Sequence, residues 1–147
     1  MPKARTTPIF TSPQDASLAF YRAFEARDID AMMSTWADDE DIVCVHPGGP
    51  RLAGFEQVRD SWRDIFAGGP AMRFQLTGQQ YLRGVRVAIH SVHENIVVTG
   101  QSRPVNPIVA TNVYIQTERG WRMLVHHASP ALREVARPEE PGPTVLH

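Results

Sequence analysis

The first part of the chain carries apolar residues at three- and four-residue spacing, the pattern of helices that bury one face. Ser12, Pro13 and Asp15 are typical of a helix start, because serine caps free N–H groups and proline suits the first turn. Phe20 and Phe24 then fall on one face, which we expect to point into the core. The pattern predicts three helices, over about residues 13–27, 28–37 and 55–67.

From about residue 71 the apolar pattern changes to alternation, which predicts strands. Apolar residues occupy odd positions in Val85–Ile89 and even positions from Val92 onward. Such a change of phase favours either a bulge or a strand that is buried on both faces. We predict a short strand at 42–46, at least four antiparallel strands between about 71 and 129, and a final hairpin that turns at 118–120.

Three helices followed by a meander of strands predict an α+β fold, with the helices on one face of an antiparallel sheet. Residues 85–98 and 109–117 are apolar in both parities, so the outer sheet face also needs cover, and we predict a homodimer. The proline-rich run 137–143 cannot continue a helix or a central strand. We expect a flexible N-terminal tail at 1–11, one domain at 12–133 and a proline-rich C-terminal tail at 134–147.

Composition narrows the classes of partner. The 147 residues are 42% hydrophobic and 21% charged with a formal net charge of −1, so no global field draws the chain to nucleic acid or to an anionic membrane. No apolar run approaches the roughly 20 residues of a membrane span. A single cysteine, Cys44, cannot form an internal disulfide, and its apolar neighbours predict a buried, unreactive thiol. We expect a cytoplasmic protein.

Several segments resemble a known family. They are Phe20–Met32, Trp36–Asp39, His46–Gly49, Ser61–Trp62 and Gly120–Pro130. The first two are similar to the helix pair that opens SnoaL-like and ketosteroid-isomerase-like domains of the nuclear transport factor 2-like superfamily, and the last is similar to that group's final strand. The resemblance covers about residues 14–130. It implies a cone-shaped α+β barrel, in which three N-terminal helices pack on a curved antiparallel sheet and a pocket lies between them.

The resemblance makes His46 the first catalytic candidate. In the isomerase relatives, the base is an aspartate directly before a proline, just after the second helix, and His46-Pro47 stands in the corresponding region. Imidazole has an unperturbed pKa of about 6.5 and exchanges protons near neutral pH. The alternative is a histidine that bonds the loop backbone and holds the turn Pro47–Pro50 in place.

The isomerases hold an enolate with a tyrosine on the first helix and a protonated aspartate on a later strand. By alignment, the tyrosine position falls on Phe20, which cannot donate a hydrogen bond, and the aspartate position falls near Asn112, which can. A site that lacks one donor loses a few kcal/mol of transition-state stabilisation. Steroid isomerisation by the family mechanism is therefore not expected, and Asn112 remains a candidate donor.

The final strand carries two adjacent histidines. His127 shares its parity with Trp121 and Met123, so we predict that it faces the interior with Ser129 beyond it, and that His126 faces outward. An inward His127 either orients an oxygen atom of a ligand or is a core histidine bonded to the backbone.

Glu94 lies among apolar residues of a strand, where burial raises the pKa of a carboxyl, and Arg103 or a histidine are partners that would fit it. The candidate catalytic residues are His46, Asn112 and His127, and the candidate ligand-binding residues are Tyr21, Trp36, Trp62, Glu94 and Ser129. The tryptophans fit the core as well as a pocket wall. The candidate metal ligands His46, Glu94 and His127 have no local metal-binding spacing, so we predict neither a metal site nor a cofactor.

Three functions fit these residues. The first is binding of a small apolar or aromatic metabolite with proton transfer by a pocket histidine, as in an isomerase, cyclase or dehydratase. The second is ligand binding without catalysis, and the third is an association domain that only oligomerises. An open apolar cone with convergent polar groups favours the first two functions, whereas a cone filled by side chains favours assembly.

Overall fold

Three helices and six strands make up the part of the chain that the computed structural model describes, residues 7–100 and 107–132. The helices are α1 (Pro13–Ala26), α2 (Ile29–Ser34) and α3 (Phe55–Gly68). The strands are β1 (Val43–Val45), β2 (Arg51–Ala53), β3 (Met72–Arg83), β4 (Val87–Val98), β5 (Ile108–Thr117) and β6 (Gly120–Pro130). The predicted helices and long strands are confirmed, and β2 is an element that the pattern did not predict.

The helix starts follow the capping chemistry expected from the sequence. The Ser12 side chain accepts a hydrogen bond from the Asp15 N–H at 3.0 Å, and Asp28 caps α2 by accepting from the Ala31 N–H at 3.0 Å. Helix α2 ends at Ser34, three residues earlier than predicted, because the next residues bridge to β6 through the Ala37 N–H and the Met123 carbonyl at 2.9 Å. Within the described ranges, none of the helices combines the length and apolar character that crossing a membrane requires.

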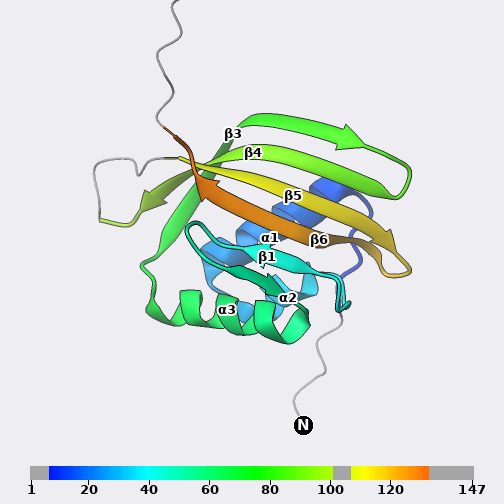
Figure 1. Cartoon of the computed structure of the whole chain (residues 1–147), viewed down its shortest axis with the longest axis horizontal. Helices are drawn as coiled ribbons and strands as arrows, with labels where there is room; N and C mark the ends of the chain where they lie inside the picture. The colour runs from blue at the N-terminus through cyan, green and yellow to red at the C-terminus, as the bar shows by residue number, and fades with distance from the viewer. Residues whose placement is uncertain (1–6, 101–106, 133–147) are drawn as a thin grey trace, which may run out of the picture.

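The strands form one curved sheet in the order β2-β1-β6-β5-β4-β3 (Figure 1). Every neighbouring pair is antiparallel except β1 and β6, which run parallel. Figure 1 shows α1 running behind the strands and α3 along the side of β1 and β2, so the helices cover one face. Phe20 and all three tryptophans are at most 2% exposed between these layers, which makes this the core.

A bulge in β6 decides which side chains reach the core. Val125 pairs with Val113 and Met123 pairs with Tyr114, so Leu124 has no partner in β5. One extra residue reverses the alternation of faces along the rest of the strand. Met123 therefore faces the core before the bulge, and His126 faces it after the bulge. Strict alternation of faces along the strand predicted that His127 faces the core, and that prediction is wrong.

The predicted change of phase in residues 85–98 has another origin. Strand β4 pairs with β5 without interruption from Val87 to Glu94, and the irregularity lies in β3, between Thr77 and Gln80. Val87 and Ile89 are 42% and 36% exposed on the outer face, whereas Val92 is 2% exposed on the inner face. The apolar residues thus occupy the outer face first and the inner face later, and β4 itself contains no bulge.

Candidate functional site

A row of residues crosses the sheet on the face that the helices cover. Its members, one from each strand in register, are Leu52, Cys44, His126, Asn112, His90 and Tyr81. We call these six residues the inner row. Its four central members are at most 2% exposed, and three of them are strongly polar. Apolar residues would stabilise the covered face of a sheet more, so this composition indicates a role other than packing.

The inner row is tied to α1 and to Glu94 by a chain of hydrogen bonds. The Tyr21 hydroxyl donates to Glu94 Oε2 at 2.6 Å, and the Asn112 amide donates to the Tyr21 oxygen at 2.9 Å. His126 Nδ1 lies 2.6 Å from Asn112 Oδ1, which can only accept, so the proton of His126 is on Nδ1. Every donor in this Glu94 chain therefore points toward the carboxyl group.

Burial sets the protonation states in the Glu94 chain. It raises the pKa of Glu94, which is 3% exposed, to about 7, and the Tyr21 hydrogen bond opposes this rise. Burial first, and the charge of Glu94 second, raise the pKa of Tyr21 well above 10. Burial lowers the pKa of His126 to about 3, which keeps the ring neutral and agrees with its role as a donor. Within this chain, Glu94 is the group that titrates near neutral pH.

The surroundings of the Glu94 chain are apolar and enclosed. Tyr21, Glu94, Asn112 and His126 are 5%, 3%, 0% and 1% exposed. Aromatic rings surround them: Phe20 lies 4.9 Å from the Tyr21 ring and 5.0 Å from the His126 ring. Among the described residues, no basic side chain forms a salt bridge with Glu94. Within the described residues, the carboxyl group is thus buried without a cationic partner.

His46 follows β1 and lies at the edge of this region. Its ring is half-buried, stands edge-on to Trp62 with 4.7 Å between ring centroids, and has Nε2 2.9 Å from Ser61 Oγ. Ser61 Oγ also donates to the Val58 carbonyl at 2.7 Å, so His46 Nε2 carries the proton that Ser61 accepts. Burial lowers the pKa of His46. His46 thus lies against Trp62 and Ser61.

The Trp62 ring lies beside both His46 and His126. Its centroid lies 4.7 Å from that of His46 and 5.9 Å from that of His126. Among the described residues, Trp62 Nε1 has no hydrogen-bond partner although the side chain is fully buried. An unpaired buried donor is costly and marks a position where a ligand atom would be favourable.

Three sequence-based placements need correction. His127 and Ser129 are exposed on the outer face, because the Leu124 bulge turns them away from the helices. The alignment placed the tyrosine of the isomerases at Phe20, which has no hydroxyl, but the neighbouring Tyr21 supplies a hydroxyl to the site. The argument that a donor is missing therefore fails.

The observed partner of Glu94 is the Tyr21 hydroxyl, and the alternative partner Arg103 lies outside the described residues. Neither His126 nor this pair carries a sequence signal, since the first depends on a bulge and the second on packing of α1 against the sheet.

Cys44 is fully buried, as predicted, and burial raises the pKa of its thiol to about 12. The group is therefore a neutral thiol and not a nucleophile, although its sulfur lies 3.6 Å from His46 Nε2. Within residues 7–100 and 107–132, no three histidine, cysteine or acidic side chains are grouped to hold a metal ion.

Comparisons with known proteins agree on the fold. A family model described as a SnoaL-like domain matches residues 14–133. Among curated proteins, the F-box protein SKIP8 of Arabidopsis thaliana is 25% identical over 110 residues, which cover 75% of this chain and 46% of that protein. The chain therefore spans less than half the length of this relative.

Two crystal structures are similar over most of the chain. A candidate association domain of calcium/calmodulin-dependent protein kinase type II from Thiobacillus denitrificans is 39% identical, with a TM-score of 0.82, over 85% of this chain and 99% of that chain. A candidate dehydratase of the NTF2-like family from Streptomyces avermitilis is 35% identical, with a TM-score of 0.73, over 80% of this chain and 92% of that chain.

Proposed function

The chain belongs to the SnoaL-like domain family, and we propose that it binds a small molecule inside its cone and transfers a proton through Glu94. The observation that supports this proposal is the Glu94 chain, in which three hydrogen bonds in series lead from His126 through Asn112 and Tyr21 to a buried carboxyl with a pKa of about 7. A buried ionisable group without a cation lowers stability, and such groups concentrate at functional sites. Glu94 thereby replaces His46 as the proposed acid–base residue.

The geometry supports a division of roles within the chain. Near pH 7 both forms of Glu94 are populated, so the carboxyl group can take a proton from carbon and return it elsewhere. Oε2 accepts from Tyr21, whereas Oε1 accepts no hydrogen bond among the described residues and is the atom that we assign to proton transfer. Asn112 and His126 act as positioning residues, because they orient the Tyr21 hydroxyl.

The surroundings indicate the class of ligand. Phe20, Phe24, Phe74 and Trp62 pack around the site, so a small apolar or aromatic metabolite fits better than a charged one. The free Trp62 Nε1–H is the donor that we assign to an oxygen of this ligand. In the proposed reaction, Glu94 would remove a proton from the carbon next to a carbonyl group. The proton would then return to another carbon, as in an isomerisation, or its removal would be followed by loss of water, as in a dehydration. Since side chains enclose the Glu94 chain, binding requires them to move, and the same enclosure also favours the assembly function that is proposed below.

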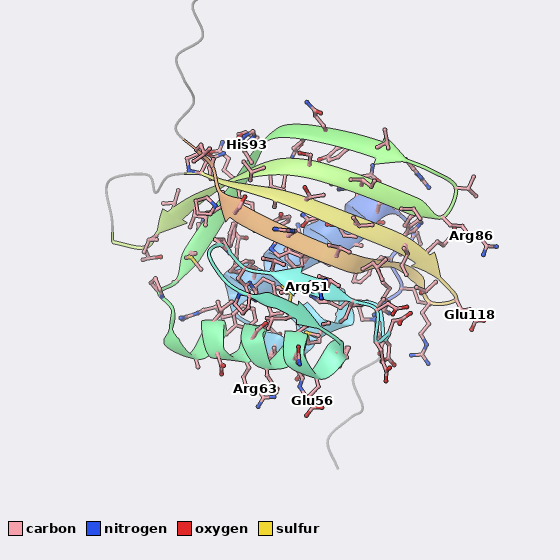
Figure 2. The ribbon with its side chains drawn as sticks, in the orientation of Figure 1. Arg51, Glu56, Arg63, Arg86, His93 and Glu118 are labelled. Carbon is pink, nitrogen blue, oxygen red and sulfur yellow. The ribbon has the colours of Figure 1, made fainter. Side chains whose placement is uncertain are left out.

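Hydrogen exchange tests the proposal without knowledge of the substrate. The protein is incubated in D2O with a panel of aromatic and alicyclic ketones, and loss of the hydrogens next to the carbonyl is followed by NMR. We expect protein-dependent exchange whose rate rises with pH through about 7, as Glu94 ionises. Glu94→Gln should lower the rate by roughly a hundredfold or more. The matched control is Glu56→Gln, because Figure 2 shows Glu56 on the outer side of α3.

His46→Gln separates this proposal from the histidine alternative. Because burial lowers the pKa of His46 and its Nε2–H is held by Ser61, we expect the exchange rate to change little. A loss confined to His46→Gln would assign proton transfer to His46. Exchange that neither substitution affects would overturn catalysis through either residue.

A specific observation also favours self-association as a second function. On the outer face, a second row crosses all six strands in register and is entirely apolar: Ala53, Val43, Val125, Val113, Ile89 and Leu82. We call it the outer row. Leu82 and Ile89 are 69% and 36% exposed. A continuous apolar row favours a contact with a second copy, and the 39% identical candidate association domain agrees with this proposal. A cytoplasmic location stays a prediction.

A further inference from the structure

A cleft of about 1160 Å³ lies apart from the Glu94 chain, between α2, the start of α3 and the turn that joins β5 to β6. No member of the Glu94 chain lines it. Its apolar walls are Ile29, Met33, Phe55 and Ile115. The remaining wall and floor carry hydrogen-bond donors, and neither the family match nor the proposed function assigns this cleft a role.

Two buried donors of the cleft have no partner among the described residues. One is Trp36 Nε1–H, on a side chain that is 1% exposed, and the other is Arg59 Nε–H, while Nη2 of the same guanidinium lies 3.5 Å from Asp60 Oδ1. An unsatisfied buried donor lowers the stability of the folded chain, so two of them in one cleft need an explanation. No unpaired buried side-chain acceptor lines the same cleft in the described part of the chain. An occupant that only accepts hydrogen bonds would satisfy both.

Arg122 adds a positive charge to the floor of the cleft. It is 6% exposed, and its guanidinium donates to the backbone carbonyls of Ser34 and Pro8. Among the described residues it forms no salt bridge. Burial first, and the neighbouring Arg119 second, lower the pKa of Arg122, and the charge of Asp38 offsets part of this change. A negative charge in the cleft would therefore be favourable.

The rim of the cleft has the opposite character. Four exposed acids line it, Asp30, Asp38, Asp39 and Glu118, together with one exposed arginine, Arg119, and Figure 2 shows Glu118 near the turn between β5 and β6, at the edge of the molecule. These carboxylates repel a ligand that carries negative charge at its outer end. The charge pattern therefore selects one anionic group inside the cleft and a neutral or cationic group at its mouth.

We propose that this cleft binds a small monocarboxylate with an apolar body, whose carboxylate accepts hydrogen bonds from Trp36 Nε1–H and from the guanidinium groups of Arg59 and Arg122. The apolar body would lie against Met33 and Phe55. We propose a carboxylate because its two oxygens accept several charge-assisted hydrogen bonds in one plane. The N–H groups of a guanidinium also lie in one plane, so the two groups match.

Titration with 3-phenylpropionate, followed by proton–nitrogen NMR of the indole groups, tests the proposal. The full chain has three tryptophans and thus three indole signals, and Trp36→Phe identifies that of Trp36. We expect a saturable shift of the Trp36 signal with 3-phenylpropionate and none with the neutral 3-phenylpropionamide. A Trp36 signal that does not move, or that moves equally with the amide, would overturn the carboxylate site.

Two arginines of α3 provide a matched pair of variants. Arg59→Gln removes a donor of the cleft and should weaken binding about tenfold, which corresponds to about 1.4 kcal/mol. Arg63→Gln should leave binding unchanged, because Arg63 does not line the cleft and Figure 2 shows it on the outer side of the helix, although both arginines contact Asp60. Equal affinities of both variants would contradict the proposal. A shift of the Trp62 signal alone would report binding in the cone, which contradicts this site but not the proposed function.

Discussion

The inner and outer rows are offset by one residue on every strand, yet their compositions are opposite. Sheets that face helices on one side usually place apolar residues under the helices and polar residues outside. Here Asn112 and His126 lie under the helices, while their neighbours Val113 and Val125 lie on the outer face. The inversion indicates that neither row is selected for the stability of the isolated chain. The inner row suits a site, and the outer row suits a contact between copies.

The largest expected effect comes from a charge in the outer row. Val113→Asp should raise the dissociation constant of the homodimer by about a thousandfold, because an unpaired charge buried in an interface costs roughly 4 kcal/mol. Sedimentation velocity across micromolar concentrations measures this change. Gln14→Asp, on the exposed side of α1, adds the same charge and should leave the dimer intact. A wild-type chain that sediments as a monomer would remove the proposed role of the outer row.

The free energy of unfolding should depend on pH because Glu94 titrates, whereas the outer row contains no titratable side chain. The pKa of Glu94 is about 7 in the folded chain and 4.5 ordinarily, so the folded state holds this proton more tightly. Stability is therefore lost as pH rises from about 4.5 to about 7, by about 3 kcal/mol in total. Urea unfolding at pH 5 and at pH 8 measures this loss. The wild-type chain should lose stability between the two pH values, and Glu94→Gln should not show that loss. Parallel pH profiles would mean that Glu94 is not buried as described.

A smaller effect is expected from the hydroxyl that joins α1 to Glu94. Tyr21→Phe keeps the ring and removes the hydrogen bonds to Glu94 and Asn112, so it should lower the free energy of unfolding by about 1–2 kcal/mol. The loss should be larger at pH 8 than at pH 5, because a carboxylate accepts a stronger hydrogen bond than a carboxylic acid. Tyr81→Phe is the control, since Tyr81 is 48% exposed. Equal losses in both variants would contradict a special role of Tyr21.

The smallest effect concerns the two adjacent histidines of β6. Diethyl pyrocarbonate should modify exposed His127 and spare His126, which is 1% exposed. NMR should also show no titration of His126 between pH 5 and pH 8, because burial lowers its pKa to about 3. Peptide mapping by mass spectrometry distinguishes the two sites. Modification of His126 in the folded chain would mean that His126 is exposed, which contradicts a bulge at Leu124.

Local signals in the sequence were sufficient for most of the architecture. Helices and long strands bury their faces at fixed periods, and the capping groups of Ser12 and Asp28 act on residues three positions away. Strand β2 was missed because three residues carry no period, and its pairing with β1 depends on the loop between them. The resemblance in residues 14–130 also identified the family correctly.

The candidate site was predicted only in part. Burial of Glu94 agrees with its apolar neighbours in the strand. The assignment of Phe20 in place of Tyr21 failed because both side chains are buried, and only the crossing of α1 over the sheet decides which one meets Asn112. No local pattern encodes that crossing.

What the sequence determined by itself is the set of elements, the apolar content of both sheet faces and the presence of an acid within a buried strand. These properties depend on residues a few positions apart. The tertiary structure decided the rest: the unpaired Leu124 turned His126 inward and His127 outward, and the packing of α1 joined Tyr21 to Glu94. The physical reason is that strand register and helix crossing are set by contacts between residues far apart in the chain, and a single bulge residue reverses every face that follows it.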